Sequence, residues 1–241
     1  MKIKLLLVLL LLSGSIYAQQ DAQFTQYMYN TININPAYAG SRESMNVFIL
    51  HRAQWVGLDG APVTSTASIN TPIEGSNIGL GLSIINDKIG PSDETNVAAD
   101  FSYSIETSDR YKLSFGLKAT ANLLNIDFNK LNQYDSGDNI FSSNVDNKFS
   151  PNIGVGLYYH SDDTYFGISA PNLLETKHFD RYAGTGSNTH IATEKIHYYL
   201  IAGHVFDLTG DVKFKPSILT KVVQGAPLQV DLSGNFLINQ S

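Results

Sequence analysis

The sequence predicts an all-β protein, namely an antiparallel transmembrane β-barrel with about ten strands in this chain. Three observations predict this fold: an N-terminal export signal, long segments of alternating apolar and polar residues, and links whose length alternates along the chain. The first indicates export, the second indicates strands rather than helices, and the third favours a membrane barrel over a soluble sandwich.

The N-terminus has the features of a secretory signal peptide. Lys2 and Lys4 precede an unbroken apolar run at 5–12, and small residues lead up to Ala18. We expect cleavage after Ala18, because a basic start, an apolar core and a small-residue site form the export signature. The apolar run is too short to span a hydrocarbon core, which needs about 20 residues. No later apolar run is long enough either, so we assign 1–18 to a signal peptide and expect no membrane-spanning helix.

The composition of the mature chain excludes several classes of protein. Removal of the signal peptide leaves 14 basic and 22 acidic side chains, a net charge of −8. Nucleic-acid binding needs a basic footprint, so we expect no nucleic-acid partner. The chain has no cysteine, which excludes disulfides, thiolate chemistry and a lipoprotein anchor. We expect one barrel domain at 45–241, preceded by a segment at 19–44 that packs in the lumen or along the periplasmic rim.

Alternation with period two dominates the mature chain, and successive side chains of a strand point to opposite faces. Several segments reach the length of about 9–11 residues that a tilted strand needs to cross a bilayer. Glycines such as Gly79, Gly81 and Gly154 share one face, where we expect small side chains to permit curvature and leave room for a lumen. The ten predicted strands are 45–55, 63–71, 77–86, 95–106, 110–123, 151–160, 164–170, 196–208, 212–223 and 228–239.

The links between these strands differ in length according to parity. Those after the even-numbered strands are short: 72–76, 107–109, 161–163 and 209–211. Those after the third, fifth and seventh strands are longer: 87–94, 124–150 and 171–195. Bacterial outer-membrane barrels alternate short periplasmic turns with longer external loops, whereas a sandwich has no reason to do so. Aromatic residues near many strand ends fit interfacial girdles, although the aromatic preference of β-structure is an alternative explanation.

The most distinctive residues lie at 23–40 and 51–64, with a shorter block at 79–90. Residues of these blocks that we single out are Phe24, Tyr27, Asn35, Pro36, Tyr38, Gly40, Arg52, Gln54, Trp55, Gly57, Pro62, Asp87 and Gly90. In this order the blocks closely resemble the PorP/SprF family of outer-membrane proteins of the type IX secretion system. The resemblance continues through 112–117, 151–156 and 215–217, so it covers nearly the whole mature chain.

The resemblance implies a non-enzymatic secretion component of the outer membrane. Its implied partners are outer-membrane lipid, the periplasmic ring of the secretion machine, and secreted adhesin-type cargo. In gliding bacteria, some family members serve the delivery or surface attachment of such adhesins. Family members usually continue for a few more strands, so we expect these ten strands to be part of a larger barrel. Two alternatives remain open from the sequence: a porin or solute transporter, and a soluble exported β-sandwich that binds a ligand.

The residues of the three blocks also have a structural explanation. Asn35-Pro36 starts a turn, and Gly40 suits a turn or the entry to a strand. Arg52 lies on the strand face opposite Val47, Ile49 and Trp55, so it faces the lumen if those three face lipid. Turn and girdle residues alone would account for the pattern, and the sequence therefore leaves structural anchoring and partner contact both open.

We find no motif for catalysis, a metal or a cofactor. The six histidines never form a close ligand pair, and no cysteine assists them. The acidic stretch at 135–139 lacks the alternating acids and distal glutamate of a dedicated calcium loop. The sequence predicts no enzyme, no metal site and no cofactor.

Overall fold

The computed structural model describes residues 28–130, 144–175, 177–183, 187–193 and 195–238. The predicted signal peptide, Phe24 and Tyr27 lie outside these ranges. Helical structure within them is limited to α2 (Thr31–Ile34) and the 3-10 turns η1 (Pro36–Tyr38) and η2 (Phe128–Lys130). Among the described residues, no helix is long and apolar enough to cross a membrane.

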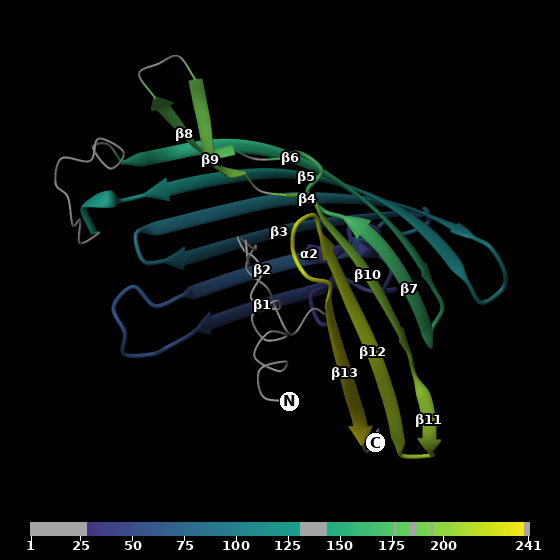
Figure 1. Cartoon of the computed structure of the whole chain (residues 1–241). Helices are drawn as coiled ribbons and strands as arrows, with labels where there is room; N and C mark the ends of the chain where they lie inside the picture. The colour runs from purple at the N-terminus through teal and green to yellow at the C-terminus, as the bar shows by residue number, and fades with distance from the viewer. Residues whose placement is uncertain (1–27, 131–143, 176, 184–186, 194, 239–241) are drawn as a thin grey trace, which may run out of the picture.

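Eleven strands form one antiparallel sheet that follows chain order and curves around the segment carrying α2 (Figure 1). They are β1 (Asn46–Ala53), β2 (Val63–Pro72), β3 (Ile78–Ile89), β4 (Ser92–Glu106), β5 (Lys112–Ile126), β6 (Val145–His160), β7 (Thr164–Ala170), β10 (His197–His204), β11 (Phe206–Thr209), β12 (Val212–Val223) and β13 (Gln229–Ile238). Over the described residues the sheet is not closed, and β1 and β13 form its two edges. The predicted all-β antiparallel fold of the barrel class is confirmed.

Two strands were missed by the sequence analysis. The predicted link 171–195 contains a separate hairpin of β8 (Lys177–Ala183) and β9 (Ser187–Thr193), which pair only with each other. The predicted strand 196–208 is divided at Val205 into β10 and β11. The register with β12 is the same on both sides of Val205, and the Val205 amide donates to the Asp163 carbonyl oxygen at 2.8 Å, just beyond the pairing of β10 with β7.

The predicted link 87–94 is wrong, since β3 and β4 continue through it and leave only 90–91 as a turn. Polar pairs hold this hairpin tip together. Asn86 donates to Asp93 at 2.8 Å, and Lys88 forms an ion pair with the same carboxylate at 3.5 Å. The sequence analysis assigned 87–94 to a loop because its residues are polar. Polar residues can also continue a strand beyond its apolar part, as they do here. The link after the third predicted strand, which was predicted to be long, is therefore a short turn.

The link predicted at 124–150 is also shorter in the structure. β6 begins at Val145 and pairs with β5 down to Ile126, across a register shift near Leu124. The links 127–144 and 171–196 remain longer than the turns 107–111 and 161–163. The predicted difference in loop length thus persists for these two links. The end of the sheet that carries 54–62, 90–91 and 127–144 is called the loop end below, and the opposite end the turn end.

The compact part of the molecule lies where the N-terminal segment meets the sheet. η1 contacts β4, β5 and β6. Ile32, Ala37 and Tyr38 are buried against Tyr158 of β6, together with Ile201 and Leu219 from β10 and β12. Tyr38 and Tyr158 meet edge to face, with ring centroids 5.5 Å apart. This arrangement links the first described residues to strands at both sides of the sheet.

Candidate functional site

One face of the sheet, called the outer face here, is apolar and exposed. On β5 the exposed side chains are Phe115 and Leu117, and Leu117 is 59% exposed. The same pattern recurs on the neighbouring strands, where exposed apolar residues include Leu80, Leu82, Ile84, Phe101, Tyr103, Ile105, Phe149, Ile153, Val155, Leu157, Phe166 and Ile168. A water-soluble protein rarely exposes a contiguous apolar patch of this extent, so this face fits a lipid environment.

The opposite face, called the inner face here, is polar and buried. Ser102 of β4 and Ser114 of β5 are both 0% exposed. Further buried polar residues on this face are Thr64, Thr66, Ser68, Asn70, Ser83, Asp100, Lys118, Thr120, Asn122, Asn152, Ser169, Ser217 and Lys221. Apolar residues outside and polar residues inside reverse the order of a soluble protein, and this reversal is typical of membrane barrels.

Residues 30–40 cover the middle of the inner face and bond to five strands, namely β2, β4, β5, β6 and β7. The side-chain amide of Asn35 donates to the Leu157 carbonyl oxygen at 2.9 Å, and its oxygen accepts from the Ala37 amide at 3.0 Å. Further bonds run from Ser102 to the Ala39 oxygen at 2.5 Å, from Ser169 to the Ile34 oxygen at 2.9 Å, and from Ser68 to Asn30 at 2.8 Å. The polar inner face thereby satisfies backbone groups that would otherwise lie buried without partners.

Glycines of the inner face allow this segment to approach the sheet closely. A Cβ added at Gly116 would lie 2.0 Å from the Ala37 nitrogen, and one at Gly79 would lie 2.1 Å from the Ala39 oxygen. Gly156 is similarly restricted by the Asn35 side chain at 2.1 Å. The sequence analysis expected small inward residues to leave space for a lumen. At these three positions the space is filled by the N-terminal segment instead.

A buried ion pair lies beneath the segment. Lys118 Nζ is 2.9 Å from Asp100 Oδ1, and the two side chains are 4% and 0% exposed. Lys118 also donates to the Ile32 carbonyl oxygen at 3.2 Å. The pair therefore connects β4, β5 and α2, and the removal of one partner would leave an uncompensated buried charge.

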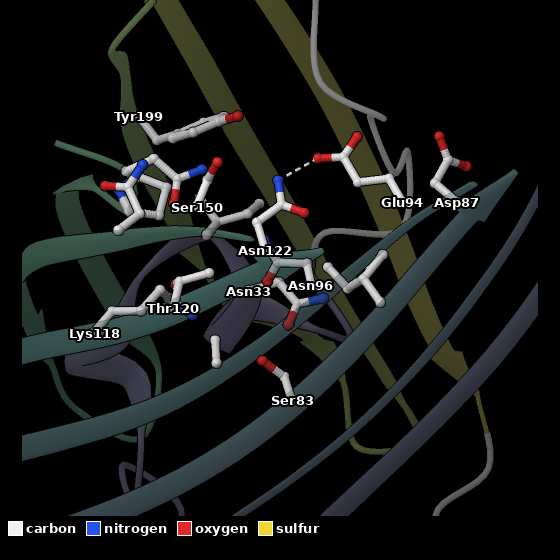
Figure 2. A pocket seen from close by; sticks show the side chains of 16 residues that line it. Asn33, Ser83, Asp87, Glu94, Asn96, Lys118, Thr120, Asn122, Ser150 and Tyr199 are labelled. Atoms are coloured by element: carbon white, nitrogen blue, oxygen red, sulfur yellow. Dashed lines mark hydrogen bonds between the residues drawn. The ribbon is translucent and has the colours of Figure 1, made fainter. Parts of the chain in front are cut away.

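Two cavities flank the N-terminal segment. The one toward the loop end has a volume of about 160 Å³ and is shown in Figure 2. The one toward the turn end has a volume of about 430 Å³. It is lined by charged and polar groups that include Arg42, Arg110, Lys112, Asp162, Asp163 and Lys215. The segment separates these two spaces on the inner face.

The residues singled out from the sequence fall into two groups. Asn35, Pro36 and Tyr38 lie buried on the inner face, and Gly40 follows them with a φ of +66°, a conformation that favours glycine. The second group lies toward the loop end and comprises Arg52, Gln54, Trp55, Gly57, Pro62, Asp87 and Gly90. The structure does not bring the two groups together into one site.

The second group is organised by backbone and side-chain bonds. The backbone N–H of Gln54 donates to the Pro62 carbonyl oxygen at 2.9 Å, and that of Gly90 donates to the Gly60 carbonyl oxygen at 2.9 Å, so the 54–62 loop joins the β3–β4 tip. Asp87 accepts from Thr64 at 2.5 Å. Gly57 and Gly90 have positive φ angles, of +99° and +56°. Arg52 lies on the half-buried face of β1, opposite the exposed Val47 and Ile49.

Sequence reasoning missed the residues that receive the N-terminal segment. Ser102, Lys118, Gly116 and Gly156 lie on the inner face and contact residues 32–39. The strand alternation placed these glycines on one face, and that was the available signal. Among the described residues, no group of three or more His, Cys, Asp or Glu side chains is arranged to hold a metal ion.

The apolar outer face, the polar inner face and the antiparallel order define a membrane protein of the transmembrane β-barrel class. The family model of the type IX secretion system membrane protein PorP/SprF matches residues 16–241, and the chain belongs to this family. Membership makes the protein a secretion-system component, and it implies the outer membrane and contact with other secretion components. No curated protein and no solved structure gives a significant match.

Proposed function

We propose that the protein is a non-enzymatic outer-membrane component that supports secretion or surface attachment of adhesin-type cargo. Export would use the signal peptide at 1–18, with cleavage after Ala18. Family membership supports the secretion role, and the apolar outer face supports a position in lipid. The periplasmic ring of the machine and the cargo are the partners of this proposal.

The observation that carries the proposal is the attachment of residues 30–40 to the inner face. Bonds from Asn35, Ser102 and Ser169, together with the close approach at Gly116, hold this segment across the middle of the sheet. An open porin needs a continuous aqueous path along this face, and the segment obstructs it. We therefore propose that the described part of the 19–44 segment, from residue 28 onward, acts as a plug rather than as a pore lining.

The topology supports one orientation in the membrane. Short turns such as 161–163 join strands at the turn end, and the longer links 127–144 and 171–196 join strands at the loop end. Short turns are periplasmic in bacterial barrels. The cavity lined by Arg42, Arg110 and Lys215 would then face the periplasmic ring. The loop-end group around Trp55 would face outward, where it would anchor the loops or contact cargo.

Two experiments test this proposal. Purified protein in a planar bilayer should give no steps of an open pore, whereas large stable steps would support the porin alternative. Deletion of the gene should lower the surface amount of at least one secreted adhesin in a comparison of surface proteomes. Unchanged delivery of every adhesin would reject the secretion role for this chain.

A further inference from the structure

The cavity between the N-terminal segment and the loop end has the lining of a binding site. It has a volume of about 160 Å³, which exceeds the roughly 10–15 Å³ that one water needs by the same measure. Its walls come from β3, β4, β5, β6 and β10, with α2 at its base. Figure 2 shows Asp87 and Glu94 at one side and Lys118 and Thr120 at the other. Neither Ser102, which bonds to the segment, nor Gly116, where the segment approaches closely, lines this space.

Three buried polar atoms on residues that line this cavity lack a partner among the described residues. They are Asn33 Oδ1, Asn122 Oδ1 and Thr120 Oγ1, and Asn122 and Thr120 are 8% and 7% exposed. The orientation of the Asn122 amide is fixed, because its nitrogen donates to the Glu94 carboxylate (dashed in Figure 2). Its oxygen must therefore be the atom without a partner. A buried acceptor of this kind is costly unless a donor reaches it, so the cavity suits a ligand that donates hydrogen bonds.

The charge of the cavity selects among such donors. Asp87 and Glu94 line it and form no ion pair with any residue that the structure describes. The cation in the lining, Lys118, is already paired with Asp100 at 2.9 Å and bonded to Ile32. The uncompensated charge is therefore negative. A cationic donor fits it better than a neutral hydroxyl group.

The remaining walls fit an alkyl chain that ends in a cation. Ile34 and Ile85 supply apolar surface, and Tyr199 supplies an aromatic ring (Figure 2). An aromatic ring near a carboxylate attracts ammonium groups. A primary ammonium has three donors and no acceptor, which matches a lining rich in acceptors. We propose that this cavity binds a primary ammonium group on an alkyl chain, supplied by a lysine side chain of a peptide or by a free alkylamine.

The test uses purified full-length protein in detergent and measures binding by calorimetry. The two cationic probes are Nα-acetyl-lysine N-methylamide and n-pentylammonium chloride, and Nα-acetyl-norleucine N-methylamide is the neutral control. We expect at least one cationic probe to bind and the neutral control not to bind. Tighter binding of the lysine probe indicates a peptide source, whereas equal or tighter binding of pentylammonium indicates a free amine.

Matched variants locate the binding. Glu94→Gln removes one charge with little change of shape and should weaken the cationic probe by about tenfold or more. Asp93→Asn is the control, since the Asp93 side chain bonds to Asn86 and Lys88 on the outer face and does not line this cavity. It should leave the dissociation constant unchanged. Thr120→Val is an independent second variant that should also weaken binding.

Three outcomes would overturn the inference. The first is that neither cationic probe binds the unaltered protein. The second is that the norleucine control binds as tightly as the lysine probe. The third is that Glu94→Gln and Thr120→Val both bind the probe like Asp93→Asn. None of these outcomes depends on secretion of cargo, so the inference can fail while the proposed function stands.

Discussion

Gly116→Ala tests whether the N-terminal segment depends on the close approach to β5. The new Cβ would lie 2.0 Å from the Ala37 nitrogen and 2.4 Å from the Pro36 carbonyl carbon. Both neighbours are backbone atoms, which cannot rotate away as a side chain could. The segment must therefore shift from the sheet, or the strand must deform.

The expected cost follows from two contributions. Overpacking by one methyl group costs about 1–3 kcal/mol. Displacement of the segment also weakens bonds such as Ser102 to Ala39, each contributing about 0.5–1.5 kcal/mol. We expect Gly116→Ala to lower the free energy of unfolding by about 2–4 kcal/mol.

The assay is urea unfolding of full-length protein in lipid vesicles, followed by the fluorescence of Trp55, the one tryptophan of the chain. Gly210→Ala is the matched control, because a Cβ at Gly210 meets nothing within 4 Å. The control should stay within about 0.5 kcal/mol of the unaltered protein. Equal unfolding midpoints for the two variants would refute the reasoning. They would show that the stability of the protein does not depend on the close contact between Gly116 and the N-terminal segment.

Three further predictions concern the outer face, the buried pair and the turn after η1. Leu117→Arg should lower the free energy of unfolding in vesicles by about 2–4 kcal/mol, and an unchanged value would argue against lipid contact at this position. Asp100→Asn should cost about 3–5 kcal/mol in the same titration, because it leaves the Lys118 charge buried without a partner. Asp163→Asn breaks an exposed pair and should cost about 0–1 kcal/mol, so similar losses in these two variants would contradict the assignment of a buried pair. Gly40→Ala should lower the thermal midpoint, since φ is +66° and the new Cβ would lie 2.6 Å from the β3 backbone; an unchanged midpoint would show that the turn relaxes.

Much of the sheet was predictable from the sequence. The alternation around Phe115, Leu117 and Lys118 identified both the strands and their two faces, because side-chain direction in a strand depends only on position parity. The antiparallel order followed from the short links between neighbouring segments. These features are local, and local patterns are what a single sequence carries most directly.

The β3–β4 tip and the β8–β9 hairpin could not be predicted in the same way. Asn86, Asp87 and Lys88 have low strand propensity, and cross-strand bonds to 93–95 hold them extended. Strand propensity is assigned to each residue separately, so it does not include the pairing between residues of two strands. The apolar pattern ends before this tip, so the pattern gave no sign that the strands continue.

The inner-face site was only partly predictable. The block at 23–40 was distinctive, and Asn35, Pro36 and Gly40 had turn chemistry that the sequence makes visible. The contacts between this block and Gly116 or Gly156 join residues far apart in the chain. Nothing local specifies them, and the inward glycines were accordingly interpreted as space for a lumen.

A spin-label scan of 112–126 in vesicles tests the central claim most directly, because the chain has no cysteine and each single-cysteine variant can be labelled cleanly. The claim is that β5 has one face in lipid and the other beneath the N-terminal segment. We predict high collision rates with oxygen at 115, 117 and 119, and low rates with both oxygen and a water-soluble nickel reagent at the inward positions 118 and 120, which already carry side chains. Strong nickel collisions at 118 and 120 would show an open aqueous face. The loss of period two in the oxygen profile would contradict the membrane assignment.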